Sequence, residues 1–206
     1  MLSSHGVPFG VESVVRTPDE ASLWAKNHRG PFVVKANGAK LTHKSERGLV
    51  RLGLAGEQEV LGAAQTILER ITPEDGEVTL TVAEMTLGNR ELIVGAMRDD
   101  SLGACVLIGA GGIFAEQLND VAIRQFPVDE SDVRDMVSEL RIREVLGHAR
   151  HCAPLDLTAL TSLANSLSAV MVDDHIESID LNPVFAMPDG EGAFAVDAVI
   201  EVGDGH

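Results

Sequence analysis

Lysine is confined to one part of this 206-residue chain. The four lysines are Lys26, Lys35, Lys40 and Lys44, although the formal net charge of the chain is −16. Three of them lie in KANGAKLTHKSERG, residues 35–48, among small residues and a histidine. Ammonium groups and the N–H groups of a loop together bind polyphosphates. The segment therefore predicts either a phosphate-binding loop or an exposed basic loop that offsets the acidity around it.

His43 lies between two of these lysines. An imidazole nitrogen that is activated by its neighbours accepts a phosphoryl group and passes it on. The chain contains seven histidines, and a single histidine more often has an ordinary surface or core position. The local sequence leaves both interpretations of His43 open.

Two oxygen-bearing residues near the end of the chain lie in apolar segments. Asn182 is part of SIDLNPV, and Asp197 is part of FAVDAVI. Mg²⁺ takes hard oxygen ligands and shares its remaining positions with phosphates, so one ligand on each of two adjacent strands suits it. Asn-Pro is also an ordinary turn signal. Strand interiors disfavour Asp, however, and apolar residues flank Asp197 on both sides, which favours a magnesium site.

A glycine-rich segment, GAGGIF at residues 109–114, follows an apolar run. It predicts a close approach of backbone to an anion, a point where two parts of the chain move, or a tightly packed turn after a strand. The chain contains neither GxxxxGK[ST] nor GxGxxG. A P-loop or Rossmann nucleotide site is therefore disfavoured.

Composition excludes several classes of partner. Aromatic residues make up 3% of the chain and tyrosine is absent, which argues against stacking platforms for single-stranded nucleic acid. The pI of about 4.7 argues against nucleic acids and membrane surfaces as partners. Hydrophobic residues make up 45%, enough for a sizeable core of Val, Leu, Ile and Ala.

The cysteines and the hydropathy pattern predict a cellular location. Cys105 and Cys152 form no metal-binding or CxxC pattern, so we expect free thiols in a reducing compartment. No apolar run reaches membrane-spanning length, and the N-terminus lacks a signal-peptide pattern. We therefore expect a soluble, cytoplasmic protein.

Apolar periodicity and turn signals predict the elements that position these residues. We expect helices at residues 17–30, 56–71, 129–147 and 155–174. We expect strands at residues 31–36, 49–54, 77–85, 90–99, 105–116, 120–128, 176–187 and 192–202. In the first helix, Thr17 is the expected N-cap, Glu20 completes a capping box and Gly30 ends the helix.

The order of these elements predicts the fold class. A purely parallel, doubly wound sheet would alternate strands and helices more strictly. We expect an α+β protein with two lobes, residues 1–83 and 84–206. The lysine-rich segment then forms a hairpin-like loop in the first lobe.

Six long segments carry a resemblance to a known family, in the same order along the chain. They are GVPFGVESVVRTPDEA, PFVVKANGAKLTHKSERGLVRLGL, VAEMTLGNRELIVGAMRD, GAGGIFAEQLNDVAIRQFPV, IDLNPVF and AFAVDAVI. With them the chain resembles the ATP-grasp subunit of ADP-forming acyl-CoA synthetases, such as ADP-forming acetate–CoA ligase. Succinyl-CoA synthetase is similar more distantly. The resemblance implies an ATP-grasp fold, two α+β lobes in the broad α/β class, with the nucleotide between them.

The resemblance implies roles for individual residues. His43 would carry phosphate, and Asp180 would orient the phosphohistidine. The magnesium ligands would be Asn182 and Asp197. The residues expected to bind the nucleotide are Lys35, Lys44, Ser45, Glu84, Met85, Glu91 and Arg124.

The chain also departs from the family pattern. Relatives usually read HKSDVGGV where this chain reads HKSERGLV, so Leu49 replaces a glycine and Glu46 and Arg47 replace Asp and Val. A glycine required for φ > 0 would make Leu49 strain or reshape the loop. Ser178 stands where relatives carry Glu.

The resemblance implies the reaction acid + CoA + ATP ⇌ acyl-CoA + ADP + phosphate, with ATP or ADP and Mg²⁺ as cofactors. It also implies an oligomeric enzyme in which a CoA-binding alpha-type subunit or domain recognises the acid or acyl-CoA. The alternative is a non-catalytic ATP-grasp module that binds nucleotide or serves assembly. The altered loop favours this alternative, whereas the retained His43, Asn182 and Asp197 favour the enzyme.

Overall fold

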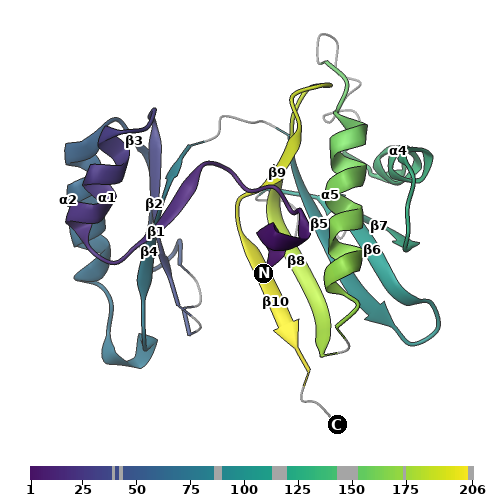
Figure 1. Cartoon of the computed structure of the whole chain (residues 1–206), viewed down its shortest axis with the longest axis horizontal. Helices are drawn as coiled ribbons and strands as arrows, with labels where there is room; N and C mark the ends of the chain where they lie inside the picture. The colour runs from purple at the N-terminus through teal and green to yellow at the C-terminus, as the bar shows by residue number, and fades with distance from the viewer. Residues whose placement is uncertain are drawn as a thin grey trace. The chain divides into compact units, whose positions relative to one another are not determined.

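The chain folds into two compact units. The computed structural model describes residues 1–38, 40–41, 44–85, 90–112, 120–142, 153–173 and 175–203. The N-terminal unit is Gly10–Leu87, and the C-terminal unit combines Met1–Phe9 with Gly88–His206 (Figure 1). Each unit contains a sheet and helices, and the predicted α+β class is confirmed.

An antiparallel sheet forms the N-terminal unit, with the strand order β1-β4-β2-β3. Its strands are β1 (Glu12–Val15), β2 (Phe32–Asn37), β3 (Val50–Leu54) and β4 (Thr79–Glu84). Its helices are α1 (Pro18–Lys26), α2 (Glu57–Leu68) and the short 3-10 helix η2 (Pro73–Asp75). In Figure 1, α1 and α2 cover one face of this sheet.

Alternation along β2 decides which side chains face the helices. Phe32, Val34 and Ala36 are buried and belong to the core beneath α1 and α2. Successive strand residues point to opposite faces, so Lys35 lies on the face away from the helices. We call this face, with Lys35, Asn37 and Thr81, the open face of the N-terminal sheet.

The first helix differs from its prediction at both ends. Thr17 caps α1 as predicted, since its hydroxyl accepts a hydrogen bond from the Glu20 backbone. The Glu20 carboxylate, however, accepts from the N–H of Arg16 and not of Thr17, so the predicted capping box is wrong. The helix ends at Lys26 with Asn27 as C-cap, before Gly30 is reached.

The C-terminal unit contains a second antiparallel sheet, ordered β10-β8-β5-β6-β7 with β9 beside β8. Its strands are β5 (Glu91–Asp99), β6 (Gly103–Ala110), β7 (Val121–Gln125), β8 (Ile176–Ala186), β9 (Ala193–Ala195) and β10 (Ala198–Val202). Its helices are α4 (Glu130–Glu139), α5 (Leu157–Val170) and the 3-10 helix η1 (Leu2–His5). The helices pack on one face of this sheet over a core that includes Val94, Ile108 and Leu181 (Figure 1). The opposite face, with Glu91 and Asp180, is the open face of the C-terminal sheet.

The first nine residues belong to the C-terminal unit, although the predicted division placed them in the first lobe. Leu2 and Val7 are buried in the C-terminal core, and Phe9 packs against it. The carbonyl oxygen of Pro8 also accepts a hydrogen bond from Ala195. Apolar contacts thus assign this segment to the later part of the chain, and the N-terminal unit ends at Leu87.

Three further elements differ from the sequence predictions. The helix predicted at 129–147 is capped by Asp129, as the capping-box hydrogen bonds with Asp132 show, but α4 ends at Glu139. The strand predicted at 192–202 is two strands, β9 and β10, because the chain breaks its pairing before Ala198. Strand β1 was not predicted at all.

Candidate functional site

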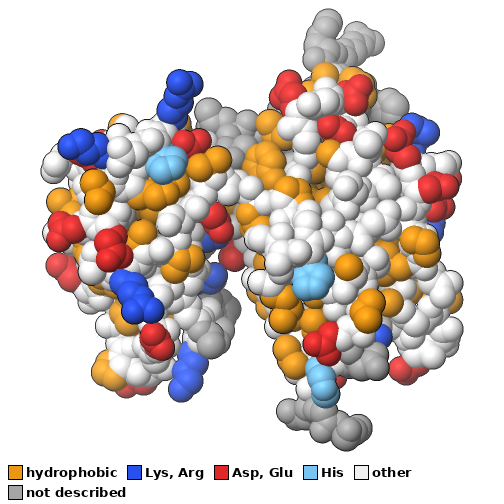
Figure 2. All heavy atoms as spheres, viewed as in Figure 1, with side chains coloured by type: hydrophobic (Ala, Val, Ile, Leu, Met, Phe, Trp, Pro, Cys, Tyr) orange, Lys and Arg blue, Asp and Glu red, His pale blue; other side chains and the backbone are white. Residues whose placement is uncertain are grey.

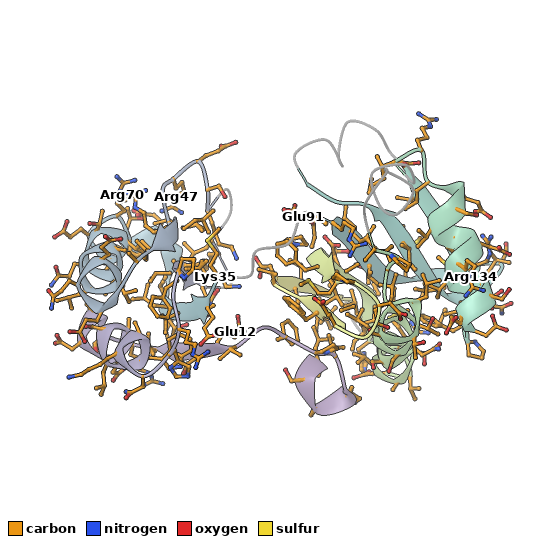
Figure 3. The ribbon with its side chains drawn as sticks, turned by 90° about the horizontal axis from the view of Figure 1, so that it is seen from above. Glu12, Lys35, Arg47, Arg70, Glu91 and Arg134 are labelled. Carbon is orange, nitrogen blue, oxygen red and sulfur yellow. The ribbon has the colours of Figure 1, made fainter. Side chains whose placement is uncertain are left out.

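Lys35 lies near the middle of the open face of the N-terminal sheet (Figure 3). Its side chain is 12% exposed, and its Nζ lies 3.9 Å from Oε2 of Glu12. Strand β4 separates β1 from β2, so the lysine reaches across one strand to this carboxylate. A partly buried ammonium held in this way is a candidate phosphate ligand, and a bound phosphate would compete with Glu12 for it.

A tight turn, residues 44–48, carries two more of the predicted ligands. The carbonyl oxygen of Lys44 accepts a 2.8 Å hydrogen bond from Leu49, and that of Ser45 accepts a 3.0 Å bond from Gly48. We call these residues the Lys44–Gly48 turn. Gly48 has φ +65°, the left-handed region that glycine enters without strain. His43 directly precedes the turn in sequence and lies outside the described residues.

Leu49 explains one of the departures in sequence. Its side chain is fully buried and packs in the core of the N-terminal unit. Its carbonyl oxygen also accepts a 2.9 Å hydrogen bond from Ala36 on β2. The residue that replaces a glycine is therefore a core residue, and the left-handed glycine of the turn is its neighbour, Gly48.

Glu84 and Met85 lie where β4 ends. The Glu84 carboxylate accepts a 2.9 Å hydrogen bond from the backbone of Arg29, and its N–H donates to the carbonyl of Val11. The N–H of Met85 donates to the carbonyl of Pro31 at 2.7 Å. Because the N–H groups of Glu84 and Met85 donate hydrogen bonds within the N-terminal unit, the carbonyl groups of these residues are the candidates for binding a nucleotide base.

In the C-terminal unit, Glu91 lies against the glycine-rich turn after β6. Its carbonyl oxygen accepts a 2.9 Å hydrogen bond from Gly111. A Cβ at Gly111 would lie 2.6 Å from the backbone carbon of Glu91, and one at Gly112 would lie 3.3 Å from Oε2 of Glu91. Only glycines permit this close approach, so the GAGGIF segment packs the turn onto Glu91.

Asn182 and Asp180 lie on β8, and Asp197 lies beside them, directly before β10. The N–H of Asn182 donates a 3.2 Å hydrogen bond to the carbonyl of Asp197, which directly precedes β10. Burial, followed by the charges of Asp197 and Glu201, raises the pKa of the Asp180 carboxyl above its usual value. The structure therefore brings the two predicted metal ligands and Asp180 into one acidic region of the C-terminal unit.

A metal ion in this region would take some of its ligands from the protein and the others from water and phosphate oxygens. Among the residues that the structure describes, no group of three His, Cys, Asp or Glu side chains could hold a metal. Mg²⁺ binds through one or two carboxylates and completes its shell with water and phosphate oxygens. The Asp197 carboxylate and the amide oxygen of Asn182 are ligands of the type that Mg²⁺ prefers.

Arg124 has a different position from the other predicted ligands. It pairs with Val106 in the sheet and shares the helix-covered face with Ala122. Its guanidinium forms an ion pair with Glu139 of α4. The structure thus places Arg124 away from the open face of the C-terminal sheet.

Two carboxylates next to predicted site residues were missed in the sequence. Glu12 contacts Lys35, and the β-branched valines of VESVV could have predicted the strand that carries it. Glu201 lies opposite Ser178 and accepts a 2.7 Å hydrogen bond from its hydroxyl. Glu201 thus supplies a carboxylate next to the position where relatives carry Glu, which only the strand register reveals.

The two units carry very different charge. Nine of the 16 Lys and Arg residues lie in residues 10–87, together with 11 of the 32 Asp and Glu residues. Figure 2 shows several of these basic side chains on the visible face of the N-terminal unit. The remaining acidic residues belong to the C-terminal unit, which also carries the predicted metal ligands. The N-terminal unit is therefore nearly balanced in charge, whereas the C-terminal unit is strongly acidic.

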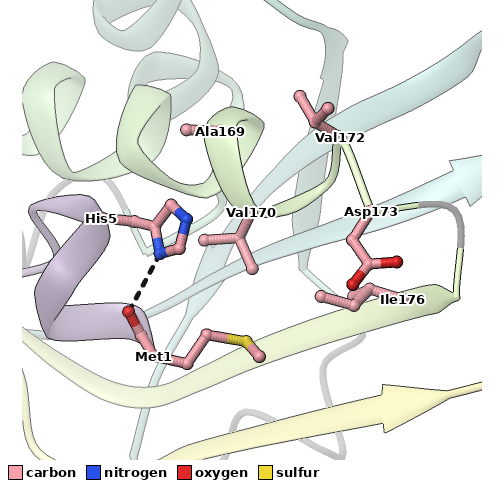
Figure 4. A pocket seen from close by; sticks show the side chains of 7 residues that line it. All are labelled: Met1, His5, Ala169, Val170, Val172, Asp173 and Ile176. Atoms are coloured by element: carbon pink, nitrogen blue, oxygen red, sulfur yellow. Dashed lines mark hydrogen bonds between the residues drawn. The ribbon is translucent and has the colours of Figure 1, made fainter.

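A separate pocket lies in the C-terminal unit between η1 and the end of α5. It has a volume of about 310 Å³ (Figure 4). Its lining residues are Met1, His5, Ala169, Val170, Val172, Asp173 and Ile176. The His5 ring is held by a 3.0 Å hydrogen bond between Nδ1 and the Met1 carbonyl. None of the predicted site residues lines this pocket.

The cysteines and the helices bear on the predicted location. Cys105 is a buried free thiol, and burial raises its pKa. Cys152 lies outside the described residues. None of the helices in the described part of the chain is long and apolar enough to cross a membrane.

Comparisons with known proteins agree over almost the whole chain. A family model described as an ATP-grasp domain matches residues 1–202. The beta subunit of ADP-forming acetate–CoA ligase II from Pyrococcus furiosus is 33% identical over 205 residues, which cover 97% of this chain and 87% of that subunit. The ADP-forming 4-hydroxybutyrate–CoA ligase of Nitrosopumilus maritimus is 29% identical over 204 residues, 97% of this chain but only 29% of that protein.

A solved structure has the same fold. Dinucleotide-forming acetyl-coenzyme A synthetase 1 of Ca. Korarchaeum cryptofilum, in complex with coenzyme A and Ca-AMPCP, superposes with a TM-score of 0.87. The sequences are 30% identical, and the match covers 98% of this chain and 89% of that one. Another structure of that enzyme contains coenzyme A and Mg-AMPPCP, with a phosphohistidine segment that points towards the nucleotide site.

Proposed function

Because this chain belongs to the ATP-grasp family, we propose that it is the nucleotide-binding subunit of an ADP-forming acyl-CoA synthetase. The observation that carries the proposal is the acidic region where Asn182 meets Asp197 beside Asp180. Its side chains are of the oxygen-bearing type that a cation prefers, and solved relatives contain nucleotide analogues with Mg²⁺ or Ca²⁺. The reaction is acid + CoA + ATP ⇌ acyl-CoA + ADP + phosphate.

This proposal assigns nucleotide binding to the residues predicted from the sequence. Lys35 and the Lys44–Gly48 turn, with Lys44 and Ser45, bind the phosphates, and the chain at Glu84 and Met85 binds the base. Glu91, whose carbonyl oxygen accepts a hydrogen bond from Gly111, is the predicted nucleotide-binding residue of the C-terminal unit. Arg124 is left out, because its guanidinium is engaged with Glu139 on the helix-covered face.

Asn182 and Asp197 would hold Mg²⁺, which neutralises charge on the phosphates when bound. A nitrogen of His43 attacks the terminal phosphorus of ATP, forming an N–P bond while the bond from phosphorus to the ADP oxygen breaks. Lys35 offsets the charge that develops on the phosphate oxygens. Asp180 would orient the phosphohistidine, as the resemblance implies. Catalysis therefore depends on positioning and on charge neutralisation.

The rest of the reaction requires a partner. This chain spans 87% of the length of a beta subunit that it resembles but 29% of a single-chain relative. We assign coenzyme A binding and recognition of the acid to an alpha-type subunit or domain, with which the chain forms an oligomer. Since ATP and coenzyme A are its substrates, we assign the complex to the cytoplasm.

A second function is favoured by the altered turn. Arg47 and Leu49 replace residues of the usual glycine-rich form, as expected of a nucleotide-binding module without turnover. Such a module would bind MgATP and assemble with a partner, yet form no phosphoenzyme. The same measurement separates it from the enzyme.

The test is phosphorylation of the chain by labelled ATP in the presence of its partner. We expect acid-labile, base-stable phosphate on the wild type and none on His43→Ala. His175→Ala, which removes an exposed histidine, is the matched control and should label like the wild type. Equal labelling of the wild type and His43→Ala would refute the role of His43. Magnesium-dependent ATP binding without any labelling would favour the non-catalytic module.

A further inference from the structure

Arg47, one of the residues that departs from the family pattern, forms a two-pronged ion pair with Asp75. Its Nη1 lies 2.7 Å from Oδ1 of Asp75, and its Nη2 lies 2.8 Å from Oδ2. The Asp75 side chain is 6% exposed, whereas that of Arg47 is 32% exposed. Parallel hydrogen bonds from a guanidinium to a carboxylate fix direction as well as distance. The pair therefore connects Arg47 of the Lys44–Gly48 turn to η2, which follows α2 in the chain.

The Asp75 carboxylate is itself held in place. Its Oδ2 accepts hydrogen bonds from the backbone and hydroxyl of Thr72, at 2.8 and 3.1 Å, in a capping box. The hydrogen bonds from Arg47 and then from Thr72 hold its pKa far below the usual range. The carboxylate is thus a rigid and permanently charged anchor for Arg47 at neutral pH.

A second arginine supports the same turn from the end of α2. Nη1 of Arg70 donates a 3.1 Å hydrogen bond to the carbonyl oxygen of Arg47, and the two arginines lie side by side in Figure 3. A Cβ at Gly48 would lie only 2.0 Å from Nη1 of Arg70. Gly48 thus serves both the left-handed conformation and the approach of Arg70.

Gly38, near the start of the lysine-rich segment, lies close to Glu77 and Val78, which follow Asp75 in the chain. A Cβ at Gly38 would lie 3.0 Å from the carbonyl oxygen of Glu77 and 3.3 Å from Cγ2 of Val78. Leu41 is buried in the core of the unit. Gly38 and Arg47, which lie on either side of His43 in the sequence, thus both lie close to residues 75–78.

An exposed ion pair on the surface would not hold a turn in one conformation. The pair between Arg134 and Glu130 on α4 has one 2.8 Å contact, and its side chains are 59% and 45% exposed. Exposed pairs of this kind contribute little, because water screens them. The Arg47 pair differs in its two parallel bonds and in its buried, pre-anchored carboxylate.

We propose that the Arg47–Asp75 pair is a positioning device that holds the Lys44–Gly48 turn in the conformation that binds the nucleotide phosphates. The proposal rests on the proposed function. It implies that this chain has replaced a flexible, glycine-rich turn with one fixed by an ion pair and by Leu49. Arg47 acts through the turn and does not itself contact the nucleotide.

The test compares Arg47→Gln and Arg47→Lys with Arg134→Gln in the full chain. Hydrogen exchange is measured at the amides of Gly48 and Leu49, which are bonded inside the turn. Affinities for MgATP and AMP are measured by calorimetry. We expect Arg47→Gln to exchange at least about tenfold faster at these amides. Its ATP affinity should fall by about tenfold, while its AMP affinity stays nearly constant. Arg47→Lys keeps the positive charge but loses the two parallel hydrogen bonds of the guanidinium. Its exchange rates and its ATP affinity should therefore be intermediate.

Two outcomes would overturn the proposal. One is an Arg47→Gln variant whose exchange and ATP affinity match those of the wild type and of Arg134→Gln. The other is an equal loss of ATP and AMP affinity in both Arg47→Gln and Arg47→Lys, which would indicate general unfolding. A wild type that binds no ATP would refute the proposed function and the phosphate role of the turn with it. The exchange data would still show separately whether the pair holds the turn.

Discussion

The backbone N–H of Asn182 donates a 3.2 Å hydrogen bond to the carbonyl oxygen of Asp197. This bond continues the pairing of β8 with β10, in which Leu181 lies opposite Ala198. Two residues that are 15 positions apart in sequence are thereby neighbours in the sheet. Their adjacency is the strongest local support for a cation site in this chain.

Asp197→Asn and Asn182→Ala should weaken the magnesium dependence of nucleotide binding. Each removes one hard oxygen or its charge from the cation. We expect ATP affinity in the presence of Mg²⁺ to fall by roughly tenfold or more, about 1.4 kcal/mol per tenfold, with little change in the absence of metal. Calorimetry with and without Mg²⁺ measures both, and Asp173→Asn in the same unit is the control. A loss that is equal with and without metal would contradict the assignment.

Lys35→Met should reduce affinity for ATP by at least about tenfold, since it removes a charge-assisted contact with the phosphates. Lys26→Met is the matched control, because Lys26 is exposed at the end of α1 and lacks a role in the proposed site. Competition binding with a fluorescent nucleotide measures the effect. If both variants bind ATP alike, Lys35 is not a phosphate ligand.

Asp180 should make the fold less stable as pH rises. Burial, then the charges of Asp197 and Glu201, raises its pKa in the folded state above the unfolded value. The folded protein therefore holds the proton more tightly, and this favourable contribution is complete below the unfolded pKa. It is lost as pH rises through the raised folded pKa.

Asp180→Asn should accordingly melt at a higher temperature than the wild type at pH 7, and the difference should shrink as the pH is lowered to about 4, near the ordinary pKa of an aspartate. Added Mg²⁺ should stabilise the wild type more than the variant, because the cation offsets the carboxylate repulsion. Thermal melts across pH, with and without Mg²⁺, provide the test. A variant that is less stable than the wild type at pH 7 would show that ionised Asp180 is instead favourably paired.

Leu49→Ala should cost about 2–5 kcal/mol of unfolding free energy, as for other fully buried leucines. Leu49→Gly, which restores the residue usual in relatives, should cost more because glycine adds backbone entropy to the unfolded chain. Denaturant unfolding measures both, with Leu52→Ala, an exposed residue of β3, as the control. A Leu49→Gly variant as stable as the wild type would mean that the turn repacks around glycine.

Gly111→Ala should disturb the position of Glu91. The added Cβ would lie 2.6 to 2.8 Å from backbone atoms of Glu91 and Leu92, which cannot rotate away. We expect a cost of about 1–3 kcal/mol and weaker ATP binding. Gly62→Ala, in α2 with open space around it, should instead be neutral or stabilising by about 0.5–1 kcal/mol. A Gly111→Ala variant with wild-type stability would show that the turn shifts freely.

Hydrophobic periodicity and turn-forming residues in the sequence predicted most of the helices and strands. The apolar run PFVVKA predicts β2, and the structure places Lys35 on the face opposite Val34. The ATP-grasp resemblance is confirmed by the family match over residues 1–202. Periodicity could not predict which unit each segment joins, because contacts between residues far apart in the sequence decide this. The first nine residues join the C-terminal unit only because Leu2 and Val7 find their core there.

Arg124 illustrates why the site was harder to predict than the fold. In DVAIRQF the larger apolar residues, Val121 and Ile123, suggest a buried face that excludes Arg124. In the edge strand β7, the small Ala122 faces the helices and Val121 and Ile123 are exposed. The partner Glu139 comes from a helix that begins after the strand, so neither the face nor the ion pair could be read from spacing.

The assignment of Met1–Phe9 to the C-terminal unit has a topological consequence. Residues 10–87 form an insertion within that unit, since the chain leaves it after Phe9 and returns to it at Gly88. The two ends of the insertion are neighbours, because Glu12 pairs with Ala83 and the N–H of Glu84 donates to Val11. Because its two ends are adjacent, an inserted unit of this kind can be deleted, circularly permuted or exchanged between homologues. Residues 10–87 are therefore the natural fragment to express for studying Lys35 and the Lys44–Gly48 turn in isolation.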